Sequence, residues 1–124
     1  MALEEFEGAI VLEVDGREID CTSLSVRAST GRRLVRTMNK TGNAAGFTKG
    51  VSQFDLTVTA VVPKGGNDVD WDNIVGAKIT REPIGGGQRH SYLDCFTTEV
   101  AQSFEVDGEA RKTINMHALR EVKE

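Results

Sequence analysis

The strictest pattern in this sequence is a period-two alternation over residues 54–62. Apolar side chains stand at every second position: Phe54, Leu56, Val58, Ala60 and Val62. Polar residues, including Asp55, occupy most positions between them. Successive side chains of a β-strand point to opposite faces, so the pattern predicts a strand with one buried and one wetter face. Pro63 ends this strand, because proline cannot donate a hydrogen bond to a sheet.

Similar strands are predicted on both sides of this one. Residues 10–14 alternate in the same way, and Asp15-Gly16 supplies a tight turn. Residues 17–26 then return as a second strand, in which a slip of the apolar phase predicts a bulge or a bend near Thr22-Ser23. Later strands are expected over 78–82, over 90–104 and around 114–118, with hairpin turns at Gly85-Gly86-Gly87 and Asp107-Gly108.

A single helix is predicted between these groups of strands. We expect a short α-helix over Asp70–Gly76, with Asp68 or Asp70 as its N-cap and Gly76 as its end. Trp71 is then the residue that anchors the helix on the core. The fold class that follows is mainly β: an antiparallel β-sandwich or barrel with one short α-helix, forming a single domain over residues 1–124.

A long window of one charge sign interrupts the strand pattern. From Cys21 to Phe54 the chain has no Asp or Glu but six cations: Arg27, Arg32, Arg33, Arg36, Lys40 and Lys49. The whole chain carries −4, so the residues outside this +6 window carry −10. The middle of the window, Thr30 to Gly50, is rich in Gly, Asn, Ala and Thr, which predicts a long basic loop.

Three interpretations of this loop are open. It can be a solvated surface loop, a nucleic-acid-binding loop, or a segment that docks on another subunit. Nucleic-acid binding favours aromatic side chains between the charges, and only Phe47 is available. A long loop in a compact domain is usually functional, so we favour docking. The expected contact residues are Arg32, Arg33, Arg36, Lys40, Phe47 and Lys49.

Catalysis, metal binding and membrane insertion find no support in the sequence. Cys21, His90, Cys95 and His117 do not follow the spacing of a zinc site, and no nucleophile stands with a base. We therefore expect no enzyme activity and no cofactor. No apolar run is long enough to span a bilayer, and the acidic start does not resemble a signal peptide, which predicts a cytoplasmic chain at synthesis.

The layout of the chain resembles the major tail tube protein of long-tailed bacteriophages, which is related in fold to the type VI secretion tube protein. The resemblance rests on the opening hairpin over 11–18, the basic loop and the strand over 54–59. The helix over 70–76 and the late hairpin over 105–109 continue it. The match covers nearly the whole chain and depends on the order and spacing of these segments.

This resemblance implies a structural virion protein. Such subunits form six-membered rings that stack into a tube, and DNA passes through the tube at infection without specific binding. The partners implied are further copies of the chain and other phage tail proteins, in the host cytoplasm during assembly and in the virion tail afterwards. The lumen tends to be acidic, which makes Asp55, Glu99 and Glu105 the expected lumen-facing residues. The alternative is a small OB-like β-barrel that binds nucleic acid or a partner protein.

Overall fold

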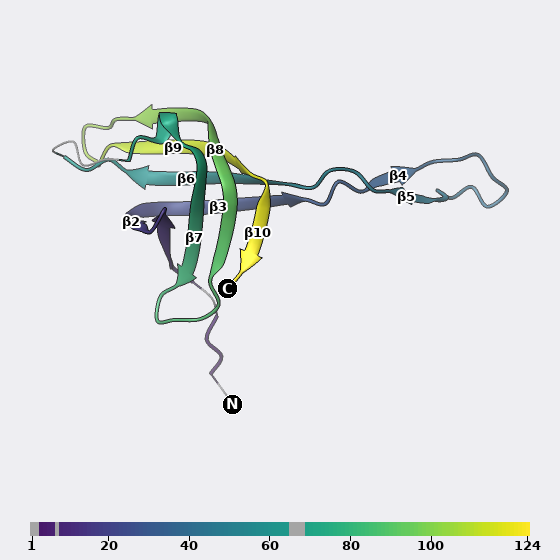
Figure 1. Cartoon of the computed structure of the whole chain (residues 1–124), viewed down its shortest axis with the longest axis horizontal. Coiled ribbons are helices and arrows are strands. Elements are labelled where there is room, and N and C mark those ends of the chain that lie inside the picture. Colours follow the sequence, from purple (N-terminus) through teal and green to yellow (C-terminus); the bar gives the residue numbers. More distant parts are fainter. Residues whose placement is uncertain (1–2, 7, 65–68) are drawn as a thin grey trace.

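The computed structural model describes residues 3–6, 8–64 and 69–124. Its body is one strongly curled antiparallel sheet of eight strands, from which a narrow two-stranded arm projects (Figure 1). The order along the sheet is β2-β1-β7-β8-β9-β6-β3, with β10 pairing on β8 beyond the end of β9. The mainly β, antiparallel class predicted from the alternating patterns is confirmed, and the sheet forms a half-barrel.

Most strands of the body lie within or extend the predicted segments, whereas β10 forms in a segment for which no strand was predicted. They are β1 (Ile10–Val14), β2 (Arg17–Ile19), β3 (Cys21–Ser29), β6 (Gln53–Val61), β7 (Val75–Pro83), β8 (His90–Ser103), β9 (Arg111–Ala118) and β10 (Arg120–Lys123). The arm contains β4 (Arg33–Val35) and β5 (Gly46–Thr48).

The curl of the sheet is visible in how its two edge strands connect. β2 pairs with β1 at one edge and β3 pairs with β6 at the other, yet only Asp20 separates β2 from β3 in the chain. The predicted single strand over 17–26 is therefore two strands at opposite edges. The predicted bulge is present, as the β3–β6 register shifts between Cys21 and Ser23. Because one residue joins both edges, the sheet must bend round toward closure.

The hydrophobic core fills the inside of the curl. The alternating residues of β6 supply Leu56, Val58 and Ala60, each at most 2% exposed. β1 adds Leu12 and β9 adds Ile114, both fully buried. The predicted inward face of the strand over 54–62 is thus the core face, and its polar positions lie on the opposite side of the sheet.

A bulge in β8 changes which of its residues reach the core. Asp94 has φ +57°, and the β7–β8 register shifts beside it, between Ala77 and Ile79. Tyr92 and Cys95, three residues apart, are consequently both buried. Regular alternation places residues three apart on opposite faces, so the bulge is what brings both side chains to the core.

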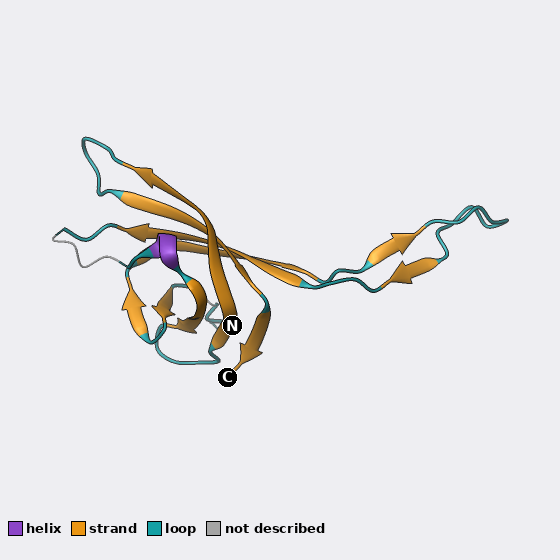
Figure 2. Ribbon diagram, turned by 45° about the horizontal axis from the view of Figure 1, so that its top comes forward, coloured by secondary structure: helices purple, strands orange, loops and turns teal. Residues whose placement is uncertain are grey.

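The predicted α-helix over Asp70–Gly76 is wrong in type and length. In its place the structure has a 3₁₀ turn, η1 (Trp71–Asn73), which Figure 2 shows at the rim of the half-barrel. Ile74 is already extended, and Val75 pairs with Phe96 as the first residue of β7. Strand pairing with β8 therefore overrides a short helix, which is marginal on its own.

The residues expected to bound that helix have other roles. Asp70 makes no side-chain cap to a backbone N–H; its Oδ2 accepts a hydrogen bond from Nδ2 of Asn73 at 2.7 Å. Asp68, the other expected N-cap, lies outside the described residues. Gly76 has φ +80° and lies where the β7–β8 register shifts, so it serves a strand bulge. Trp71 is 1% exposed and belongs to the core cluster.

Candidate assembly surfaces

The arm, residues 30–50, leaves the body where two glycines cross. Gly31 has φ +78°, and a Cβ on it would lie 2.4 Å from the backbone oxygen of Val51. A Cβ on Gly50 would lie 2.5 Å from the backbone oxygen of Gly31. Two backbones approach this closely only where neither carries a side chain. The glycines of this segment therefore define the base of the arm.

Beyond this crossing, the predicted loop is a β-hairpin. Residues Arg33–Val35 pair with Gly46–Thr48 in a separate two-stranded sheet. At the turn, Oδ1 of Asn39 accepts hydrogen bonds from the backbone N–H groups of Thr41 and Gly42, at 3.0 and 3.1 Å. The segment has too few apolar residues for a recognisable strand pattern, which is why the sequence indicated only a loop.

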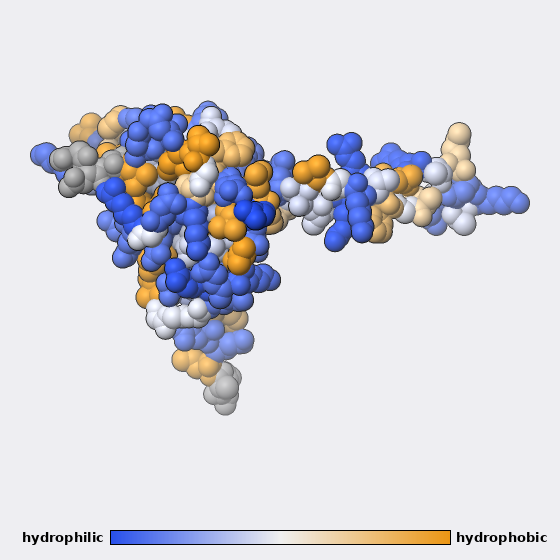
Figure 3. All heavy atoms as spheres, viewed as in Figure 1, coloured by the Kyte–Doolittle hydropathy of each residue, from blue (hydrophilic) through white to orange (hydrophobic). Residues whose placement is uncertain are grey.

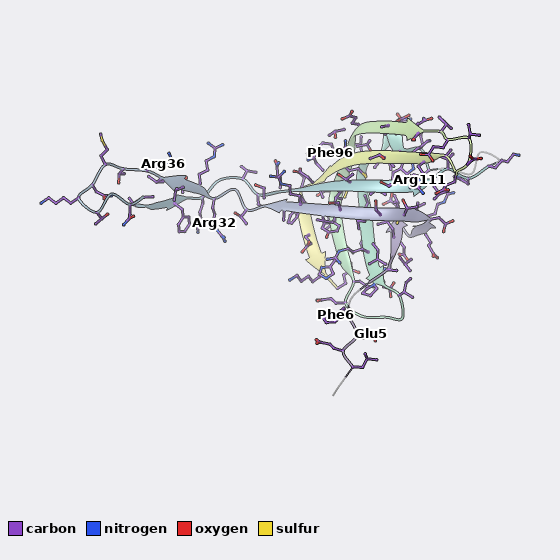
Figure 4. All side chains as sticks on the ribbon, turned by 180° about the vertical axis from the view of Figure 1, so that it is seen from behind. Glu5, Phe6, Arg32, Arg36, Phe96 and Arg111 are labelled. Atoms are coloured by element: carbon purple, nitrogen blue, oxygen red, sulfur yellow. The ribbon has the colours of Figure 1, made fainter. Side chains whose placement is uncertain are left out.

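Basic side chains and exposed apolar side chains alternate along this arm. Arg32, Arg33, Arg36, Lys40 and Lys49 are all exposed, and in the part of the chain that the structure describes none of them forms an ion pair. Leu34, Met38 and Phe47 are also exposed, from 61% to 104%. Figure 3 shows this mixture of hydrophilic and apolar spheres along the arm, and Figure 4 shows Arg32 and Arg36 projecting from it. An isolated domain gains nothing from such a surface, but a contact with another chain does.

The base of the arm contains an open hollow of about 580 Å³, which we call the basic hollow. Three cations line it, Arg32, Arg33 and Lys49, together with backbone at the glycine crossing and several neutral side chains. None of its described lining residues is acidic. The hollow is therefore suited to a carboxylate-bearing partner.

The face of the sheet opposite the core is polar over β3, β6, β9 and β8. Cross-strand register places Arg27, Asp55, His117 and Phe96 in one row on this face. Nδ1 of His117 lies 2.5 Å from Oδ1 of Asp55, and the rings of Phe96 and His117 are in tilted contact, with centroids 5.7 Å apart and an interplanar angle of 39°. The expected lumen residue Asp55 is thus flanked by a cation on one side and an imidazole on the other.

The other two expected lumen residues lie apart from this row. Glu99 pairs in register with Asn115, whose Oδ1 accepts a hydrogen bond from Oγ1 of Thr57 at 3.3 Å, so Glu99 belongs to the same polar face. Glu105 follows the end of β8, in the connection to β9, and lies beyond the sheet.

That connection, residues 104–110, is an exposed acidic loop. Phe104 and Val106 are 71% and 99% exposed, and Glu105 and Asp107 alternate with them. Glu109 is engaged with Arg111 by an ion pair. A backbone N–H hydrogen bond and this guanidinium hold the pKa of Glu109 below its usual value. Asp107-Gly108 thus lies in a longer loop than the two-residue turn at Asp15-Gly16, where both residues have positive φ.

The free edge of β3 borders a groove of about 470 Å³. Its lining includes Ile10 from β1 and Leu24 and Val26 from β3, so it lies where the two edges of the curled sheet separate. Among the described strands, β3 has a neighbour only on its β6 side. Unpaired backbone groups on an edge strand are a template for pairing with another chain.

Chemical sites are not evident in the described part of the molecule. Within it, no three His, Cys, Asp or Glu side chains are grouped to hold a metal ion. Cys95 is buried, and burial raises the pKa of its thiol to about 11, which is unsuited to a nucleophile. Gly85-Gly86-Gly87 forms the predicted hairpin connection between β7 and β8. Over the described ranges, no helix has the length and apolar character needed to cross a membrane.

Solved structures with the same architecture include chains of an extracellular contractile injection system and of tails. A chain of an extracellular contractile injection system, "PVC sheath/tube terminator in extended state", superposes with a TM-score of 0.77 at 20% identity and covers 99% of both chains. The SPP1 tail tube gives a TM-score of 0.64 at 13% identity, covering 92% of this chain and 74% of that one. The chain has the tail tube fold.

A further structure with the same fold is the tail of an empty GTA particle, which has C6 symmetry. It gives a TM-score of 0.63 at 13% identity and covers 93% of this chain and 92% of that chain. No protein-family model matches this sequence, and no curated protein sequence matches it significantly. The resemblance to tail tube proteins, inferred from the order of hairpins and loop, is confirmed at the level of the fold.

Proposed function

We propose that this chain is a structural subunit of a tail-type tube, in which copies associate into rings and rings stack into a hollow cylinder. The observation that carries the proposal is the fold match over 99% of both chains to a structure described as a sheath/tube terminator. Six subunits per ring is the proposed symmetry, supported by the C6 symmetry of the GTA tail with the same fold.

The surfaces of the subunit supply the two kinds of contact that a stacked tube requires. The free edge of β3 and its groove suit a lateral neighbour, because a second sheet can continue the hydrogen bonding there. The arm suits an axial neighbour. An extended chain covers about 3.3 Å per residue, so 21 residues running out and back reach roughly 30 Å from the body.

The channel wall in this proposal is the polar face of β3, β6, β9 and β8. Asp55 and Glu99 lie on it, and Arg27 and His117 stand beside Asp55, so the negative charge of the wall is partly balanced. Thr57 and Asn115 add a hydroxyl and an amide to the described part of this wall, and His117 is engaged by Asp55, so the wall attracts phosphate groups only weakly. DNA therefore passes through without specific binding.

In this role the chain is a component of the virion tail, assembles in the host cytoplasm with other tail proteins, and catalyses no reaction.

The experiment that tests the proposal is electron microscopy of the concentrated protein, with a variant of the arm. Wild-type protein is expected to form rings or tubes. The variant R32E/R33E/R36E should keep its fold, since exposed substitutions usually cost under about 0.5 kcal/mol each, but should not polymerise because like charges then meet at the contact.

The matched control is R32K/R33K/R36K, which keeps the charge and should still assemble. Tubes of normal length from the glutamate variant would show that the arm is not an electrostatic connector. Wild-type protein that binds DNA tightly, with binding lost in that variant, would favour the OB-like binding module instead.

A further inference from the structure

The basic hollow and the acidic loop lie at opposite ends of the body. β3 runs toward the arm and ends at Ser29, where it pairs with Gln53 at the start of β6. At the other end of the same strands, Val61 pairs with Arg111, and Arg111 pairs with Ser103 immediately before the acidic loop. Figure 1 shows the arm leaving one end of the sheet and the β8–β9 connection at the other.

The two surfaces are complementary in charge and shape. The hollow is concave and presents Arg32, Arg33 and Lys49, and no acidic residue is found among the described residues that line it. The loop projects from the body with two carboxylates, Glu105 and Asp107, on either side of an almost fully exposed valine. Among the described residues, neither carboxylate and none of the three cations takes part in an ion pair, so all five charges are available.

We propose that the acidic loop of one copy docks in the basic hollow of a second copy, and that this contact sets the axial register of the tube. The proposal rests on the function proposed above and names the surface that receives the base of the arm. Because donor and receiver lie at opposite ends, the contact is head-to-tail and repeats from one copy to the next. With the acidic loop in the hollow, the arm of the second copy extends along the side of the copy that donates the loop. Glu105 thereby belongs to the contact between copies and not to the channel wall.

Charge reversal of the loop tests this contact. The variant E105K/D107K should weaken self-association by roughly tenfold or more, measured by sedimentation velocity over a concentration series, because two attractive pairs become repulsive. The matched control is E4K/E5K, which makes the same change in net charge on another exposed acidic segment and should associate like the wild type. Equal weakening in both variants would show an effect of net charge and overturn the proposal.

A compensating exchange makes the test specific. The variant R32E/R33E alone should weaken self-association to a similar extent, while R32E/R33E/E105K/D107K, with both surfaces reversed, should recover most of the wild-type association. Failure to recover, with the circular dichroism spectrum unchanged, would overturn the pairing of these two surfaces.

The outcomes distinguish failure of the proposed loop–hollow contact from failure of the proposed tube function. Wild-type tubes together with normal tubes from E105K/D107K would leave the tube function intact and refute this contact. Wild-type protein that stays monomeric at its highest soluble concentration would refute both.

Discussion

Trp71 gives the sharpest test of how the core is built. Its side chain is 1% exposed at the rim of the half-barrel, on a turn of only three residues. A tryptophan buries about 150–250 Å², and at about 25 cal/mol per Å² this corresponds to roughly 4–6 kcal/mol. Trp71→Ala should therefore lower the free energy of unfolding by about 3–5 kcal/mol, the usual range for deletion of a buried aromatic side chain.

Trp71→Phe should lower the free energy of unfolding by much less than the loss of buried side-chain area suggests. The indole Nε1–H is buried and has no acceptor among the described residues, and a buried unsatisfied donor costs about 1–3 kcal/mol. Phenylalanine removes this donor while it keeps most of the packing. We expect a loss of about 0–2 kcal/mol for this variant, since the two effects oppose each other.

The assay is urea unfolding followed by far-ultraviolet circular dichroism, because the only tryptophan is the residue replaced. Dilute protein at high salt keeps the chains apart, so the measured value refers to the single subunit. Val75→Ala is the control: Val75 is 85% exposed and close in sequence, and its replacement should change stability by under about 0.5 kcal/mol. A loss below about 1.5 kcal/mol for Trp71→Ala, with an unchanged urea slope, would refute the role of Trp71 as a core anchor.

Three further predictions concern the turn, the buried thiol and the arm. Gly16→Ala should destabilise the subunit by about 1 kcal/mol in urea unfolding, because φ is +84° there, whereas Gly8→Ala, at an open position without positive φ, should be nearly neutral. Burial raises the pKa of Cys95 to about 11, so this thiol ionises at a lower pH in the unfolded chain than in the folded one. The free energy of unfolding should therefore fall between pH 9 and pH 11, and it should fall less steeply in Cys95→Ala. Backbone amides of residues 30–50 should exchange with deuterium quickly in the free subunit and slowly in assemblies, since three residue pairs hold the hairpin; strong protection in a proven monomer would contradict this.

Local sequence patterns were sufficient to predict most of the strands in the body. The alternation of Leu56 and Val58 with polar residues predicted both the strand and its buried face, because side-chain direction in a strand depends only on backbone geometry. Asp15-Gly16 predicted a tight turn for a similarly local reason: both positions need positive φ. The basic window and the docking hypothesis also came from the sequence, since a run without acidic residues needs no structural information to be seen.

Long-range pairing decided what these patterns could not. The sequence around Trp71 favours a helix locally, but β8 pairs with the backbone at Ile74 and Val75, so the helix stops after one 3₁₀ turn and a strand begins. The bulge at Asp94, the hairpin of the arm and the row that joins Asp55 to His117 likewise depend on partners distant in sequence.

The sequence by itself thus determined most of the strands of the body, which of their faces are apolar, and where the positive charge gathers. Only the tertiary structure decided which strands are neighbours, and hence that the basic hollow and the acidic loop lie at opposite ends of the body. The physical reason is that periodicity and turn chemistry act over a few residues, whereas strand order is set by burying the apolar faces of all strands together.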